Sequence, residues 1–412
     1  MFLREKGNMG FDSASAEREA HYPEKGYNLV EIDMLKPPGE ALTKIGHSLR
    51  LSDITIPATT DLTDYVVYDS NGDGYARDDV SEFPDSDDSE GVSELIDTLQ
   101  TEDGRTQRIA LARLAKAVES NPEQGLDVVP ILTSELRGLE TELQAESLYI
   151  LSTVAEGYPE QVTPGADEVL SLLDQEIDSE LLTDAIGIVA AIAEYEPDAV
   201  VDGVPKLATV LQEGSSADPM ALTALKRIAD LYPDTVVPVT PELISYIEQG
   251  SDVHRTGAIA VLGTLSKEYP HVAEETIPTA AELLDAENHM LRANAAGLLA
   301  DLADEYPMEV RPSVSRAIEL LDDDDEKVRY NATSILARIA KQYPEDVEPA
   351  IPSLIDALGE DFEYSRANAC WALGYLDADA ALDALEERKQ TDPSEEVRHA
   401  ADQAIQMISR NS

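Results

Sequence analysis

One spacing constrains the fold more than any other feature of the sequence. Short segments that contain a proline, and mostly a tyrosine, begin at positions 37 residues apart. The seven segments are Asn121-Pro122, Tyr158-Pro159, Tyr195-Glu196-Pro197, Tyr232-Pro233, Tyr269-Pro270, Tyr306-Pro307 and Tyr343-Pro344. A fixed period of this length indicates a solenoid, in which each repeat needs its neighbours because it cannot bury its apolar face alone.

Each repeat is predicted to contain two helices. In the first helix, Pro352 fits the first turn, where the missing N–H of proline costs no hydrogen bond; prolines in phase with it are Pro130, Pro241 and Pro278. The second helix has an apolar stripe and a polar opposite face. In one repeat the stripe is Val328, Ala332, Ile335, Leu336 and Ile339, and the polar face is Lys327, Tyr330, Ser334, Arg338 and Lys341. Small residues that let neighbouring second helices approach are Ala258, Ala295, Ala332 and Ala369.

The second helices resemble those of the HEAT-repeat family. The matching motif, an acidic residue before Val-Arg-x-x-Ala, is Glu326-Lys327-Val328-Arg329-Tyr330-Asn331-Ala332. A second version is Glu396-Val397-Arg398-His399-Ala400-Ala401. The resemblance covers residues 91–412 and extends to the HEAT-like repeats of haloarchaeal proteins and, distantly, to the phycobilisome-lyase-like group. It implies an all-α fold, a right-handed α-solenoid of about nine two-helix repeats. It also implies a concave binding surface lined by the second helices, with no obligatory chemistry.

The chain is strongly acidic along its whole length. It has 83 acidic and 30 basic residues, a formal net charge of −53, while 43% of its residues are apolar. Such a surface resembles those of proteins from halophilic archaea, because molar salt screens the self-repulsion. We interpret the charge as an adaptation to high salt, and we expect the second-helix surface to be acidic too. Nucleic-acid binding is disfavoured, since it depends on basic residues that reach phosphates.

Several protein classes are disfavoured by what the sequence lacks. It has no apolar window of transmembrane length, and its start lacks the apolar core of a signal peptide. Its one cysteine, Cys370, excludes an internal disulfide framework and is expected in the core. No nucleotide-binding or hydrolase motif occurs. We therefore expect a cytoplasmic protein that is not an enzyme, does not enter membranes and has no required cofactor.

The first part of the chain lacks the repeat. Residues 1–77 are predicted to be a non-repeat segment with short strands at 27–33, 49–56 and 65–68, where β-branched and apolar residues gather. Residues 78–90 are strongly acidic and are predicted to be a solvated linker. The repeat solenoid is expected to occupy residues 91–412.

One motif in this segment suggests a calcium site. Asp69, Asn71 and Asp73 occupy alternate positions and Gly74 follows, as at the start of an EF-hand-type loop. The position that needs a bidentate glutamate is Val80. A glycine-rich turn between two extended segments is the alternative.

Two regular columns of polar residues and one tryptophan are candidate partner-binding residues. They are Arg255, Arg292, Arg329 and Arg366; Asn294, Asn331 and Asn368; and Trp371. The alternative for the arginines is a ladder of ion pairs between repeats, with acidic residues that precede each arginine, such as Glu287 for Arg292. The asparagines could form a hydrogen-bonded ladder between second helices, and Trp371 could pack in the core.

The sequence therefore favours a scaffold or adaptor that captures a protein partner of unknown identity along its second helices. Three alternatives stay open. They are a HEAT-like DNA-repair glycosylase or other nucleic-acid-binding solenoid, a phycobilisome-lyase-like HEAT protein, and an adaptor in signalling or motility. A glycosylase would need a basic surface with a carboxylate on it, whereas a scaffold would need an exposed apolar or aromatic patch.

Overall fold

The structure is a computed structural model that describes residues 2–5, 19–22, 27–30, 65–68, 74–75, 89–99, 104–175 and 177–411. The chain divides into two compact units, residues 1–188 and 189–412, and the division falls within one helix, α9 (Ser179–Tyr195). The 37-residue period continues through this point, so the sequence carries no sign of a boundary there.

Unit 1 begins with short strands. Strand β1 (Phe2–Glu5) pairs antiparallel with β4 (Tyr65–Tyr68), which pairs antiparallel with β5 (Gly74–Tyr75), and β2 (Glu19–Tyr22) pairs antiparallel with β3 (Tyr27–Val30). Strands β3 and β4 lie in two of the three segments where the sequence predicts strands. The third, 49–56, lies outside the described residues, and β1, β2 and β5 were not predicted.

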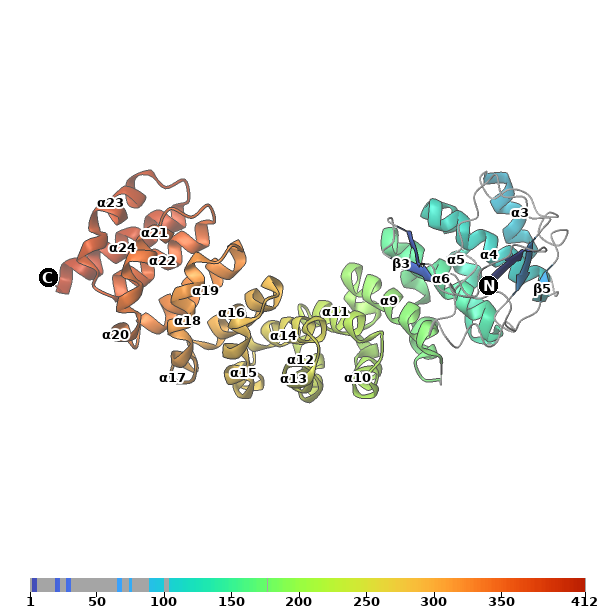
Figure 1. The fold of residues 1–412 in the computed structure, drawn as a ribbon, viewed down its shortest axis with the longest axis horizontal. Coiled ribbons are helices and arrows are strands. Elements are labelled where there is room, and N and C mark those ends of the chain that lie inside the picture. The colour runs from blue at the N-terminus through green and yellow to red at the C-terminus, as the bar shows by residue number, and fades with distance from the viewer. Residues whose placement is uncertain are drawn as a thin grey trace. The chain divides into compact units, whose positions relative to one another are not determined.

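Helices make up nearly all the rest of what is described (Figure 1). In unit 1 they are α3 (Ser89–Leu99), α4 (Gly104–Ser120), α5 (Val129–Glu135), α6 (Thr141–Gly157), α7 (Pro159–Val162), α8 (Ala166–Leu172) and the first part of α9. Helix α3 begins two residues inside the predicted linker 78–90, because acidic residues there do not distinguish a linker from the start of a helix. Residues 78–88 lie outside the described part.

Unit 2 continues from the end of α9 with helices of two kinds. The first helices and the short turns before them are α10 (Val204–Glu213), α12 (Pro233–Val236), α13 (Thr240–Gln249), α15 (Ile277–Glu282), α17 (Pro307–Val310), α18 (Val314–Glu319), α20 (Pro344–Val347), α21 (Ile351–Ala357) and α23 (Leu382–Thr391). The second helices are α11 (Asp218–Ala229), α14 (Asp252–Ser266), α16 (His289–Leu302), α19 (Glu326–Ala340), α22 (Glu363–Tyr375) and α24 (Glu395–Asn411). With α3/α4, α5/α6 and α8/α9, the described residues form nine helical pairs, as the sequence predicts.

The proline segments that define the period begin the first helix of each repeat. Tyr343 is the N-cap residue of α20, with φ −131°, and Pro344 follows at the first helical position. A 3₁₀ turn over Glu348–Ala350 leads into α21, where Pro352 again lies in the first turn. The first helix is therefore segmented, and proline appears where it removes no hydrogen bond.

The predicted apolar stripe forms the core of unit 2. Val328, Ile335 and Ile339 are fully buried, as are the alanines of the small-residue column from Ala258 to Ala369. Each second helix packs against the next, from α11 through α14, α16, α19 and α22 to α24. In Figure 1, α14, α16 and α19 lie along one side of this unit, and α13, α15 and α17 lie along the other. The predicted all-α solenoid repeat is therefore confirmed.

The tyrosine of the period joins neighbouring repeats. The hydroxyl of Tyr158 donates a hydrogen bond to Glu123 Oε1 at 2.9 Å, one repeat earlier. Tyr232 and Tyr269 bond in the same way to Asp198 and Asp234. These hydrogen bonds to carboxylates raise the pKa of each tyrosine. The tyrosine thus connects repeats, a role that its position in a breaker segment does not reveal.

Two glycines test how closely the second helices pack. A Cβ atom at Gly374 would lie 2.9 Å from Ala404 Cα, so α22 and α24 touch there, whereas a Cβ at Gly263 in α14 would meet nothing within 4 Å. We expect Gly374→Ala to lower the free energy of unfolding by about 1–3 kcal/mol because the helices must separate. Gly263→Ala should raise it by about 0.5–1 kcal/mol through helix propensity. Urea unfolding of the full chain measures both, and equal effects of the two substitutions would contradict the close packing.

Candidate functional site

The solvent-facing side of the second helices forms one continuous stripe in unit 2. We define the second-helix face as the positions of α14, α16, α19, α22 and α24 that correspond to Lys327, Tyr330, Asn331, Ser334, Arg338 and Lys341 of α19. These positions follow helical spacing, opposite the buried stripe. Lys327 and Lys341 are exposed, as predicted, but Ser334 is buried because Arg338 bonds to its hydroxyl.

The charge of this face differs from that of the rest of the unit. Residues 251–411 contain 33 acidic and 14 basic residues, yet the second-helix face holds three acidic and five basic ones. The acidic residues are Asp301, Asp304 and Glu396, and the basic ones are Lys267, Lys327, Arg338, Lys341 and Arg410. At these positions the expectation of an acidic second-helix surface is therefore wrong, although Asp252, Glu326, Glu363 and Glu395 are exposed beside them on the same helices. The acids gather instead in the first helices and turns, where they can cap helix N-termini as Asp325 does for α19.

Large apolar side chains are exposed at one position of the face. Val253 is 59% exposed, Met290 56% and Tyr364 45%, at equivalent positions of α14, α16 and α22. Tyr364 also belongs to an aromatic cluster, since its ring lies 5.3 Å from that of Phe362 and 6.4 Å from that of Tyr330. Val253 and Met290 lie on neighbouring helices, and the exposed Lys327 of α19 lies at the equivalent position between Met290 and Tyr364. Exposed apolar side chains are what a binding surface requires.

Trp371 lies on the same face, two turns after Tyr364. Its half-buried ring stacks on Tyr375 with a centroid separation of 6.3 Å and meets the ring of His399 edge-on at 6.4 Å. The neighbouring Cys370 is fully buried, as predicted, and burial raises the pKa of its thiol to about 12. Trp371 thus keeps one side open to solvent, while Cys370 is a core residue.

The arginine column forms a ladder between repeats. In Arg366, Nε and Nη2 donate to the two carboxylate oxygens of Asp392 at 2.8 and 2.9 Å, and Nη1 donates to the carbonyl oxygens of Glu360 and Asp361. Arg329 binds the carboxylate of Glu360 in the same bidentate way at 2.9 and 3.0 Å. Each guanidinium therefore fills most of its donors within the protein.

The ladder is continuous from Arg292 onward. Arg292 binds the carboxylate of Asp323 at 3.0 and 3.1 Å, and the backbone carbonyl of Asp323 accepts a bond from Arg329. At the last step, the carbonyl of Asp392 accepts a bond from Nη1 of Arg398, the equivalent arginine of α24. One residue in each turn thus bonds to two arginines, through its carboxylate to one and through its backbone to the other.

The carboxylates differ from those that the sequence suggested. They do not precede the arginine in its own repeat but belong to the turn of the following repeat, 31 residues later for Arg292 and Arg329 and 26 later for Arg366. Arg255 has Ala286 at the corresponding distance, and its Nη2 bonds to the carbonyl of Glu248. The ion pairs of the ladder therefore begin at Arg292.

The asparagine column also joins neighbouring second helices. Asn294 Nδ2 donates to the carbonyl of Thr256 at 3.1 Å, and Asn331 Nδ2 donates to the carbonyl of Ala293 at 2.7 Å. Both bonds reach the preceding repeat. Asn368 occupies the equivalent half-buried position on α22. The two bonds fix the register between consecutive second helices, as the ladder hypothesis requires.

The face also contains a partly buried carboxylate, Asp301 of α16, which no motif in the sequence indicates. Its partial burial raises the pKa of this group, although Lys267 and Arg338 act in the opposite direction. Because the folded pKa is raised, ionisation of Asp301 costs stability once the pH rises above it. No residue pattern in the sequence distinguishes Asp301 from Asp304, its exposed neighbour one turn later.

A cluster at the start of α14 contains the residue types of a catalytic triad. Ser251 Oγ lies 2.6 Å from His254 Nδ1, but His254 Nε2 is 3.9 Å from Asp218 Oδ2, beyond hydrogen-bond distance. The buried Asp218 instead accepts bonds from Tyr246 and Ser215. Ser251 and His254, three residues apart at a helix N-terminus, therefore form a local side-chain contact rather than a nucleophile and its base.

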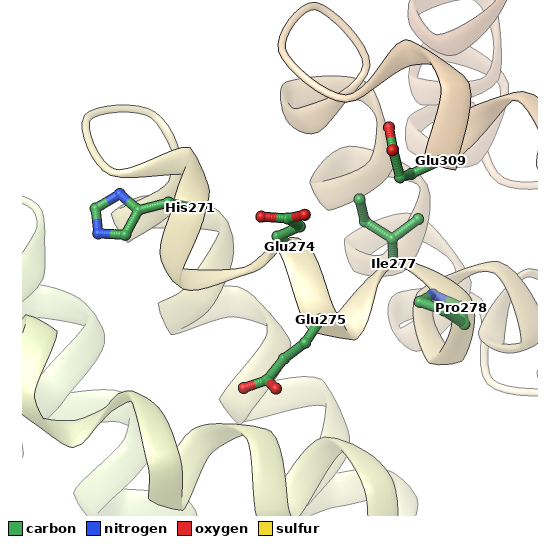
Figure 2. A pocket seen from close by; sticks show the side chains of 6 residues that line it. All are labelled: His271, Glu274, Glu275, Ile277, Pro278 and Glu309. Atoms are coloured by element: carbon green, nitrogen blue, oxygen red, sulfur yellow. The ribbon is translucent and has the colours of Figure 1, made fainter.

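A shallow depression of about 590 Å³ lies on the first-helix side (Figure 2). It is lined by His271, Glu274, Glu275, Ile277, Pro278 and Glu309. Figure 2 shows that these side chains do not converge: the imidazole and the carboxylate of Glu275 point away from the other two carboxylates. Among the described residues no group of three or more His, Cys, Asp or Glu could hold a metal ion.

The predicted calcium ligands cannot be compared with the structure. Asp69, Asn71 and Asp73 lie outside the described residues. The calcium site stays a prediction.

Comparisons with known proteins agree with the repeat geometry. Residues 314–406 match the family of HEAT repeats. A solved structure of an engineered protein is 21% identical, with a TM-score of 0.69, over 80% of this chain and 93% of that chain, so it shows the fold. No curated protein matches this sequence. These matches place HEAT repeats at residues 314–406, and the paired helices continue the same kind of fold through the rest of unit 2.

Two further findings limit what the fold implies. Across the described residues, no helix is both long enough and apolar enough to span a membrane. The fold itself matches 487 solved chains, so it does not by itself select a function.

The buried end of the ladder should dominate its contribution to stability. The side chains of Arg366 and Asp392 are 8% and 0% exposed, whereas in the Arg338–Asp304 pair they are 31% and 58% exposed. We expect Arg366→Ala to lower the free energy of unfolding by about 3–5 kcal/mol, because Asp392 is left buried without its partner. The control Arg338→Ala should cost less than about 1 kcal/mol. Urea unfolding in constant salt measures both, and similar losses would show that the ladder is not a structural element.

The same pair predicts the direction of acid sensitivity. Burial alone would raise the pKa of Asp392, but hydrogen bonds from Arg366 and the Ser394 backbone lower it below its usual value. The carboxylate therefore contributes stability above the unfolded pKa of about 3.9, and this is lost as the pH falls through the folded pKa. Asp392→Asn should lower the free energy of unfolding at pH 7. It should also make that free energy fall less steeply as the pH drops below about 5, as followed by circular dichroism. An unchanged acid transition would contradict this role.

Proposed function

We propose that this HEAT-repeat chain is a non-enzymatic scaffold that binds a protein partner along the second-helix face of unit 2. The observation that supports this most is the contrast in composition. In a unit rich in acidic residues, this face has more basic than acidic side chains and exposes Val253, Met290 and Tyr364. Exposed apolar residues aligned across three repeats cost solubility, and a partner that covers them explains their presence.

The ladders support binding by a preformed surface. Arg292, Arg329 and Arg366 tie each turn to the next repeat, and the asparagines tie consecutive second helices. A face held in this way loses little conformational entropy when a partner docks. We therefore assign the arginines and asparagines a positioning role in partner binding, while Trp371 contributes contact area directly.

The alternatives from the sequence have weaker support. A glycosylase needs a carboxylate on the face, and Asp301 could serve. The five basic residues beside three acidic ones, however, would contact few phosphates. Neither the phycobilisome-lyase-like reading nor a role in signalling or motility is favoured by a contact or a cluster among the described residues.

A cross-linking experiment tests the scaffold proposal. A photoreactive amino acid would replace Met290 on the second-helix face or Met308 on the first-helix side; both methionines are exposed, at 56% and 66%. In cells that express the full chain, we expect protein adducts from position 290 and few from position 308. Equal adducts from both positions, or adducts to nucleic acid only, would contradict the proposal.

We also propose that the acidic surface suits a cytoplasm with molar salt. The net charge of −53 repels itself in dilute buffer, and the Debye length falls from about 10 Å at 0.1 M to about 3 Å at 1 M salt. We expect the free energy of unfolding to rise by several kcal/mol between 0.1 M and 3 M KCl. Thermal unfolding in KCl, compared with sucrose, which does not screen charge, measures this. Equal stability across this range would contradict the adaptation to salt.

A further inference from the structure

Aromatic residues are concentrated in one part of the second-helix face. Residues 251–411 contain eight Phe, Tyr and Trp residues, and five of them lie on or beside α19 and α22. These five are Tyr330, Phe362, Tyr364, Trp371 and Tyr375. The other three, Tyr269, Tyr306 and Tyr343, belong to the breaker segments that define the period. Tyrosine and tryptophan are the residues that most often dominate binding energy at interfaces.

The aromatic residues form a row along α22. Tyr364, Trp371 and Tyr375 lie at positions seven and four residues apart, so they share one side of the helix. The row extends ~16 Å along the helix axis at 1.5 Å per residue. Phe362 and Tyr330 widen its first end, where the rings of Tyr330 and Phe362 meet edge-on at 5.2 Å.

A basic row runs beside it on α19, which packs directly against α22. Its members are Lys327, Arg338 and Lys341, at the positions that correspond to Tyr364, Tyr375 and the end of α22. Neighbouring helices lie ~8–10 Å apart, so one bound segment can touch both rows. Lys327 is exposed, and its side chain forms no ion pair with any of the described residues. Arg338 and Lys341 share only the exposed Asp304, at 3.0 and 3.9 Å.

From these two rows we propose that α19 and α22 form a docking site for an acidic peptide segment with aromatic or large aliphatic anchor residues. The anchors pack on Tyr364 and Trp371, and the carboxylates pair with Lys327 and Lys341. The proposal rests on the scaffold function and specifies its partner. It follows from charge complementarity, because this is the part of the face where cations gather beside exposed apolar surface.

A nucleic acid fits this site less well. Stacking of bases on Tyr364 and Trp371 is possible in principle. Affinity for a phosphate backbone, however, depends on the number of phosphates neutralised, and only three cations line the row.

The test uses the full chain and a displayed library of random 16-residue peptides, at the lowest KCl concentration that preserves its circular dichroism. We expect the selected peptides to be enriched in Asp and Glu together with Trp, Phe or Leu. Binding of the strongest peptide would then be measured by fluorescence anisotropy, with a fifteen-nucleotide oligothymidine as competitor. Selection of basic peptides, or tighter binding of the oligothymidine than of the peptide, would overturn the proposal.

Variants locate the binding. Tyr364→Ala should weaken the selected peptide about tenfold or more, as expected for an interface residue whose loss costs over 1 kcal/mol. Lys327→Glu should also weaken peptide binding, and the loss of affinity should be larger at low salt than at high salt. The matched control is Tyr195→Ala, because Tyr195 is also exposed, at 55%, but lies outside this face. Since Tyr364 and Lys327 are exposed, neither change is expected to unfold the chain.

The outcomes separate this inference from the scaffold proposal. If Tyr364→Ala and Lys327→Glu leave peptide binding unchanged while position 290 still cross-links to a protein, the scaffold function stands and the acidic docking site is wrong. If Tyr364→Ala and Lys327→Glu weaken peptide binding while Tyr195→Ala leaves it unchanged, the acidic docking site is supported directly.

Discussion

A helical pair of 37 residues has an apolar stripe that it cannot cover by itself, so each repeat depends on the next. In unit 2 the stripe is covered by the neighbouring second helix, and the column of alanines allows the two helices to approach closely. Gly374 shows how tight this packing is, since a single added methyl group would meet the backbone of α24. Burial of apolar surface supplies most of the stability of such a stack, and the polar ladders determine its register.

Much of this arrangement could be predicted, and the reasons are physical. Helical spacing and proline positions depend on the backbone alone, so the buried stripe of α19 and the start of each first helix follow from the residues. The arginine partners could not be predicted in the same way. Arg292 has acidic residues before it in sequence, but the carboxylate it binds belongs to the next turn, because its side chain extends across the stack. Of the aromatic row on α22, the sequence indicates only Trp371 as a candidate binding residue. Its extent depends on which side of the helix stays exposed, and that is decided by packing.

Acidic and basic side chains are distributed unevenly between the surfaces of unit 2. Acidic residues fill the turns and first helices, where they cap helix N-termini and accept bonds from arginine and tyrosine. The second-helix face has few of them, so the expectation that a strongly acidic chain has an acidic binding surface was wrong. Net charge describes the whole molecule and does not locate its neutral or basic patches. The proposed docking site lies within the surface that this separation leaves least acidic.

The arginine ladder also bears on how such chains can change in length. Each step needs only an arginine in one repeat and a carboxylate in the turn of the next repeat. Either acidic residue type can supply that carboxylate, as Asp323 and Glu360 show. A duplicated or deleted unit of 37 residues would therefore recreate the same bonds at its new junctions. The step from Arg366 to Asp392 spans 26 residues rather than 31, and Asp392 is the most buried of the three carboxylates. Copying a repeat can thus lengthen the array from within, without any new type of contact between repeats.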